Sequence, residues 1–174
     1  MTDADSINLA LLVLRVTVGA VMLAHGINHI FGGGKIAGTG RWFASLGMRP
    51  GWLHAWLASV MEVVAGGLLV LGLLTPLAAA AVVGVMLVAW LINHRGNGFF
   101  IFRPGEGWEY VMTLTFVGVG IGALGAGEWS LDHAIGLYED LQGLPGLLIS
   151  VLAGGGGALG LLAAFWRPQP KTEG

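Results

Sequence analysis

The chain has 174 residues, of which 55% are hydrophobic and 10% are charged; its mean hydropathy is +0.78 and its formal net charge is −2. Soluble domains carry about 25% charged residues, so this composition predicts an integral membrane protein. The chain contains no cysteine, which excludes disulfides, thiolate metal sites and cysteine-ligated iron–sulfur clusters. It has no basic run of the kind that binds nucleic acid.

Apolar segments long enough to form helices follow one another along the chain. At ~1.5 Å rise per residue, about 20 apolar residues cross a bilayer. Glycines such as those at 154–157 are tolerated in membrane helices, where small residues let backbones approach. The five segments are residues 8–31, 53–74, 76–93, 110–126 and 144–166. They predict an all-α integral membrane protein, with a four-helix transmembrane bundle in residues 1–140 and an additional transmembrane helix with a short tail in residues 141–174.

The basic residues indicate how this bundle is oriented. With five spans, every Lys and Arg except Arg15 falls in connections on one side of the membrane, while the other side has none; basic loops are typical of the cytoplasmic side. We therefore expect the N-terminus outside, the C-terminus in the cytoplasm, and a multi-pass location in the plasma membrane. The residues on the basic side are Lys35, Arg41, Arg49, Arg95, Arg103, Arg167 and Lys171.

The longer connections suggest local structure rather than phosphate chemistry. Residues 32–52 are glycine-rich, but Lys35 is followed by Ile36 and no strand precedes the loop, so neither common phosphate-binding pattern fits. We predict a turn and a short interfacial helix around residues 41–46. Residues 127–143 are expected to form a short amphipathic helix on the outer surface.

Two charged residues lie within predicted spans. Arg15 is in the first and Glu62 in the second, and a charge at membrane depth is costly unless it faces protein, water or a partner. The spacing predicts an ion pair between them. Such a pair either forms part of a functional site or joins the helices without chemistry.

A polar cluster is predicted at the cytoplasmic ends of three spans. His25 and His29 lie on the first, His94 ends the third, and Glu109 and Tyr110 open the fourth. Imidazoles exchange protons near neutral pH, and an apolar pocket with a few donors and acceptors suits a quinone headgroup. The catalytic candidates are His25, His94, Glu109 and Tyr110; the candidate quinone-site residues are Arg15, His25, Glu62 and His94. The alternative is a hydrogen-bonded seam joining the helix ends.

Other ligands receive less support from the sequence. His25 and His94 on facing helices could ligate haem, although nothing in the pattern requires it. His25 and His29 could share a metal only if a further ligand arrived, so no metal site is predicted. His54 and His133 look superficial, and we assign them no role.

Several short motifs in series resemble the DoxX family of bacterial membrane proteins. They cover about residues 9–133 and include LRVTVGAVMLAHGINHIFG, Phe43 with Leu46-Gly47, EVVAGGLLVLGLLTPLAA, His94 with Gly98-Phe99-Phe100, Glu109-Tyr110, and WSLD at 129–132. The resemblance implies a four-helix membrane bundle, and one member is the small membrane subunit of a thiosulfate:quinone oxidoreductase. This chain departs from the pattern at His29, where the family often has Lys, and beyond about residue 140.

Two functions therefore remain open. The first is a membrane subunit of an oxidoreductase-type complex that contributes a quinone-headgroup or proton-transfer site, with electrons supplied by a partner protein. The second is a non-catalytic scaffold or accessory subunit whose polar residues lock helices together while it holds partner proteins. A transporter is a third alternative, and the absence of an evident inverted repeat ranks it lower.

Overall fold

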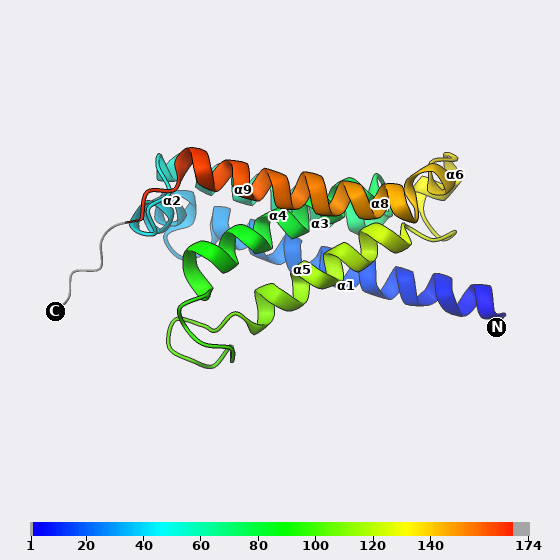
Figure 1. The fold of residues 1–174 in the computed structure, drawn as a ribbon, viewed down its shortest axis with the longest axis horizontal. Coiled ribbons are helices and arrows are strands. Elements are labelled where there is room, and N and C mark those ends of the chain that lie inside the picture. The colour runs from blue at the N-terminus through cyan, green and yellow to red at the C-terminus, as the bar shows by residue number, and fades with distance from the viewer. Residues whose placement is uncertain (1, 169–174) are drawn as a thin grey trace.

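A computed structural model describes residues 2–168, and the regular secondary structure of that part is helical (Figure 1). The helices run back and forth along one long axis. The long elements are α1 (Asp3–Phe31), α3 (Gly51–Leu71), α4 (Thr75–Ala89) continued by the π-helix η1 (Trp90–His94), α5 (Glu109–Leu124), and α8 (Leu144–Leu148), η2 (Ile149–Ala153, also a π-helix) and α9 (Gly154–Phe165) in one continuous rod. The short ones are α2 (Lys35–Ser45), α6 (Leu131–Ala134) and α7 (Tyr138–Leu141).

Within the described part, four helices are long and apolar enough to cross a membrane. They are Asp3–Phe31, Gly51–Leu71, Thr75–His94 and Leu144–Phe165, whereas Glu109–Leu124 is a shorter apolar helix of 16 residues. The prediction of an all-α membrane protein is confirmed. A fifth crossing and the orientation stay predictions.

The turn between α3 and α4 is closed by a residue from a distant loop. α3 is capped by Gly72, which adopts a left-handed backbone with φ 64°. The Asp132 carboxylate then accepts hydrogen bonds from Leu74 N (2.7 Å) and Thr75 N (3.0 Å) at the start of α4. Carboxylates are favoured there because the first amides of a helix have no partner within it. The predicted outer helix is instead two short helices, α6 and α7, and Asp132 is buried between helix ends rather than on the surface.

α1 and α3 pack closely through glycine. A Cβ at Gly19 would lie 2.7 Å from the Gly66 carbonyl oxygen, and one at Gly66 would lie 2.6 Å from that of Gly19. Farther along the same interface, Gly26 faces Ser59 and Glu62. These contacts fix the antiparallel register of the two helices.

This register corrects the expected ion pair between Arg15 and Glu62. Arg15 is fully buried and donates from Nη1 to Leu69 O (3.0 Å) and from Nη2 to Trp129 O (2.8 Å). Leu69 is seven residues from Glu62, or about 10 Å along a helix. Glu62 instead pairs with His29. The sequence placed both charges in adjacent spans but did not set how far one span slides along the other.

The rod formed by α8, η2 and α9 packs mainly against α4, with α8 also touching α5. A Cβ at Gly154 would lie 2.6 Å from the Ala80 carbonyl oxygen, so glycine permits this approach. α2 packs against α3. It spans Lys35–Ser45 and is therefore longer than the predicted segment 41–46.

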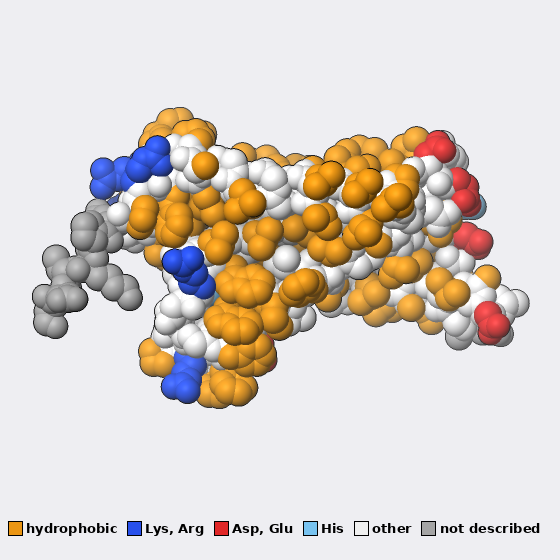
Figure 2. All heavy atoms as spheres, in the orientation of Figure 1, with side chains coloured by type: hydrophobic (Ala, Val, Ile, Leu, Met, Phe, Trp, Pro, Cys, Tyr) orange, Lys and Arg blue, Asp and Glu red, His pale blue; other side chains and the backbone are white. Residues whose placement is uncertain are grey.

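The two ends of the molecule carry opposite charge (Figure 2). Basic side chains gather at the end that holds α2, and acidic ones gather at the end that holds the start of α1. The side between them is largely hydrophobic in this view. Lys171 and the rest of the predicted tail lie outside the described residues.

Candidate functional site

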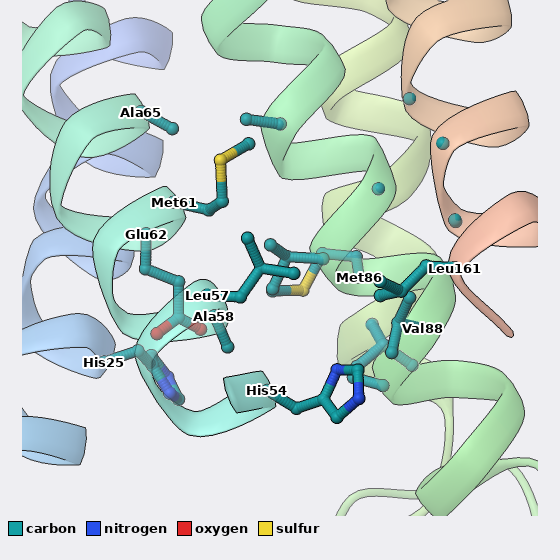
Figure 3. Close-up of a pocket in the computed structure, with 18 of the residues that line it drawn as sticks. His25, His54, Leu57, Ala58, Met61, Glu62, Ala65, Met86, Val88 and Leu161 are labelled. Atoms are coloured by element: carbon teal, nitrogen blue, oxygen red, sulfur yellow. The ribbon is translucent and has the colours of Figure 1, made fainter. Parts of the chain in front are cut away.

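A cavity of about 730 Å³ lies among α3, α4 and α9 and reaches α1, α2 and α5 (Figure 3). Its wall is mostly apolar, and its volume is typical of pockets that bind small molecules. Seven ionisable residues line it: His25 and His29 from α1, His54 and Glu62 from α3, His94 from η1, Tyr110 from α5, and Glu106 from the loop between η1 and α5.

His29 and Glu62 form the charged contact of the site. His29 Nδ1 lies 3.0 Å from Glu62 Oε2, and the Glu62 side chain is only 4% exposed. His29 also lines a second, open hollow of about 290 Å³ beside the start of α2. One imidazole therefore borders both the inner cavity and an outer hollow, and it contacts a buried carboxylate.

His25 and Tyr110 form a second contact, between α1 and α5. The Tyr110 hydroxyl lies 3.2 Å from His25 Nε2, within hydrogen-bond distance, and the two rings stack with centroids 5.9 Å apart. His25 remains exposed on its other side. The sequence predicted this proximity from the shared level of the two helix ends.

His94 is held by its surroundings through both ring nitrogens. Nδ1 lies 2.9 Å from the Glu106 carbonyl oxygen, and Nε2 lies 3.2 Å from Asn93 Nδ2. His94 is the last residue of the π-helix η1, and such bulges often occur at functional sites. Its contact with Glu106 fastens the loop between α4 and α5 to the cavity wall.

Two of the predicted site residues lie elsewhere. Glu109 Oε2 accepts a hydrogen bond from Ile101 N (3.1 Å) and so holds the same loop, but it does not line the cavity. Arg15 lies near the opposite end of the bundle, bonded to main-chain carbonyls. His25, Glu62, His94 and Tyr110 are brought together.

His54 is a site residue that sequence reasoning missed. The structure places it in the cavity wall with 2% exposure, packed edge-on against Phe165 at 5.1 Å between centroids. Within residues 2–168, neither of its ring nitrogens makes a hydrogen bond of good geometry, and the polar group that interacts with the ring is the Arg49 main chain. The spacing of His54, Ala58 and Glu62 puts all three on one helix face, and that signal could have identified it. His133 is exposed, as expected.

The two histidines expected as haem ligands have protein neighbours in this structure. His25 and His94, the expected axial pair, each contact a protein group through Nε2. Over the described chain, no three His, Asp or Glu side chains gather closely enough to hold a metal ion.

Comparison with known proteins gives one finding. Residues 10–95 match the model of the family described as DoxX. The matched range runs from α1 to the end of η1 and contains His25, His29, His54, Glu62 and His94, but not Tyr110 or the motifs after residue 95. No curated protein and no solved structure matches the chain.

Proposed function

The chain belongs to the DoxX family and is a multi-pass membrane protein, and we propose that it is a membrane subunit of an oxidoreductase-type complex that binds a quinone headgroup. The cavity offers an apolar wall with hydrogen-bonding groups at separate points, which suits a flat ring with two carbonyl oxygens. A bound quinone supplies oxygens that take up protons as its ring is reduced, with electrons from a partner subunit.

The position of His29 carries the proposal. Because this imidazole borders the outer hollow, it can exchange protons there; because it contacts Glu62, it can pass them inward. Glu62 holds the proton at the cavity wall. The Tyr110 hydroxyl, oriented by His25, is a second donor at the same end of the cavity. His94, whose two ring nitrogens are both engaged by protein groups, shapes the cavity wall rather than exchanging protons.

The proposal includes the topology. With α5 as a fifth crossing of a bacterial plasma membrane, the N-terminus lies outside the cell and the C-terminus lies on the cytoplasmic side. This orientation places the basic end of the molecule in the cytoplasm. Residues 1–140 form the core of the subunit. The rod of α8, η2 and α9, in residues 141–174, serves additionally as a docking helix for another subunit.

A scaffold is the second candidate, and the outer end of the molecule favours it. There Arg15 joins α1 to α3 and to Trp129, Asp132 caps α4, and the Asn8 side-chain amide donates to Glu128 Oε2 at 2.9 Å. All of these groups connect helices and none lines the cavity.

Native mass spectrometry of the protein, extracted from its own membrane with its partners attached, separates the two candidates. We expect a bound mass equal to that of a quinone, with occupancy reduced about two- to tenfold in Glu62→Gln, since the hydrogen bond from the protonated carboxyl to a quinone oxygen is worth ~0.5–1.5 kcal/mol. His25→Ala should weaken it as well. Asp140→Asn, at an exposed position of α7, is the matched control and should retain the mass.

The partner subunits give the decisive comparison. A redox subunit should keep them in Glu62→Gln while losing the quinone. If Glu62→Gln loses its partner subunits and the wild-type protein carries no cofactor mass, the redox proposal is wrong and the scaffold function is supported.

A further inference from the structure

The geometry points to a lateral portal between α3 and α9, through which the cavity admits a tailed, lipid-soluble molecule from the bilayer and presents His54 to its polar head. This inference deepens the proposed function and rests on it for the quinone identity of the head. The portal itself follows from the exposure of the cavity's own lining residues.

One rim of the portal lies on α3. Leu57, Met61 and Val64 line the cavity and are nevertheless 40%, 38% and 51% exposed at the surface of the bundle. Three neighbouring positions of one helix with this combination indicate an opening of the cavity on that face of α3. These positions occupy the middle of Gly51–Leu71, a helix long and apolar enough to cross a membrane, so lipid rather than water faces them.

The other rim lies on the rod that contains α9. Ala153 and Gly157 also line the cavity and are exposed. A Cβ at Gly157 would find nothing within 4 Å, whereas one at Gly154 would lie 2.9 Å from Val83 Cβ. Gly154 is therefore needed for packing against α4, while Gly157 leaves open space. Figure 3 shows α3 and α9 on the two sides of the cavity, with α4 behind it.

An apolar cluster fills the place where α2, α3 and α9 meet at the basic end. Phe43, Ala55 and Leu162 are buried together there, with Phe165 and Trp166 packed on them. Because this packing occupies the basic end of the gap between α3 and α9, the opening between these two helices lies along their apolar middle, which faces the membrane.

His54 supplies the second observation, because its imidazole is buried in the cavity wall and neither ring nitrogen makes a hydrogen bond of good geometry among the described residues; the Arg49 main chain can engage at most one of them. A buried polar group without a partner is costly, and a ligand with a carbonyl or hydroxyl would satisfy it. An alkyl or isoprenoid tail would fill the apolar remainder and extend through the portal. A water-soluble molecule would not reach the cavity through an opening that faces lipid.

The absence of cysteine makes the portal directly measurable. We would introduce Ala58→Cys, beside His54 in the cavity wall, into the full chain in lipid nanodiscs at about pH 8.5, near the ordinary thiol pKa. Membrane-soluble N-phenylmaleimide should label this thiol, and a sulfonated maleimide should not. The exposed position in Ser45→Cys is the control for the charged reagent.

Blocking the rim should close the route. Adding Gly157→Phe should slow N-phenylmaleimide labelling at least about tenfold, which corresponds to ~1.4 kcal/mol of added barrier; Gly157→Leu is the milder version. Gly156→Phe is the matched control, since Gly156 is exposed, has open space for a Cβ and does not line the cavity. Equal rates for the two phenylalanine variants, or equal labelling by the sulfonated reagent, would overturn the portal.

Protection by decylubiquinone separates the portal from the quinone. Decylubiquinone should protect the thiol in Ala58→Cys, and His54→Phe should abolish that protection while leaving the protein folded. If the quinone fails to protect although Gly157→Phe still blocks labelling, the quinone identity falls and the portal stands. If decylubiquinone still protects the thiol in the His54→Phe variant, His54 does not bind the head of the ligand.

Discussion

Arg15 is buried at the acidic end of the molecule, where its guanidinium joins α1 to the end of α3 and to Trp129. Main-chain carbonyls near helix ends need donors, and arginine can serve two of them at once. This explains a charge inside an apolar helix without assigning it any chemistry. Its removal should therefore affect stability rather than ligand binding.

Arg15→Met should lower the free energy of unfolding by about 2 kcal/mol, because buried carbonyls lose their donor. Thermal unfolding in detergent measures this effect. Arg41→Met, at an exposed position, should stay within about 0.5 kcal/mol of the wild type. If Arg15→Met leaves the stability unchanged but abolishes quinone binding, Arg15 acts in ligand binding rather than in joining the helices.

The histidines show how differently one residue type is used here. His94 is held by the loop between α4 and α5, His29 contacts Glu62 at the border of two hollows, and His54 lies in an apolar wall without a hydrogen bond of good geometry. All three line the same cavity. Their roles follow from what surrounds each ring, which spacing along the chain does not specify.

At the scale of elements, glycine determines how closely α1 and α3 approach. Gly66 lies in the interface, and a Cβ there would meet the Gly19 carbonyl and the Leu23 side chain. Its neighbour Gly67 points into open space. The two adjacent positions therefore provide a matched pair of substitutions.

Gly66→Ala should destabilise the protein by about 1–3 kcal/mol, because the added methyl group forces the helices apart. Gly67→Ala should be neutral or stabilising by about 0.5–1 kcal/mol, since alanine loses less backbone entropy in a helix. Thermal unfolding of the two variants side by side checks both values. Equal losses would mean that the helices do not pack in this register.

At the scale of the whole molecule, the separation of charge predicts orientation, and introduced cysteines can test it in a cysteine-free chain. A membrane-impermeant maleimide applied to intact cells should label Ser6→Cys and Asp140→Cys but not Ser45→Cys, all of them at exposed positions. Permeabilisation should then expose Ser45→Cys. Asp140→Cys tests α5 in particular, because residue 140 reaches the outside only if α5 crosses.

The opposite result for all three positions would invert the orientation while keeping the number of spans. Protection of Asp140→Cys alone would show that α5, at 16 residues and thus about 24 Å long, does not cross. The location of the C-terminal rod would then need a different explanation.

The sequence by itself determined the membrane class, the bounds of the long helices to within five residues and the clustering of basic residues in particular connections. These features depend on local composition and hydrophobic length, which are written along the chain. It also placed His25, His94 and Tyr110 at one level, because antiparallel helices that share a boundary bring their ends together.

Only the tertiary structure decided the partners of the buried groups. A slide of α3 along α1 separates Arg15 from Glu62 and gives the carboxylate to His29, and the rotation of α3 buries His54 rather than exposing it. The cavity arises because α3 and α9 both pack on α4 and leave space between them. Register, rotation and voids come from side-chain packing between distant segments, and no local pattern encodes them.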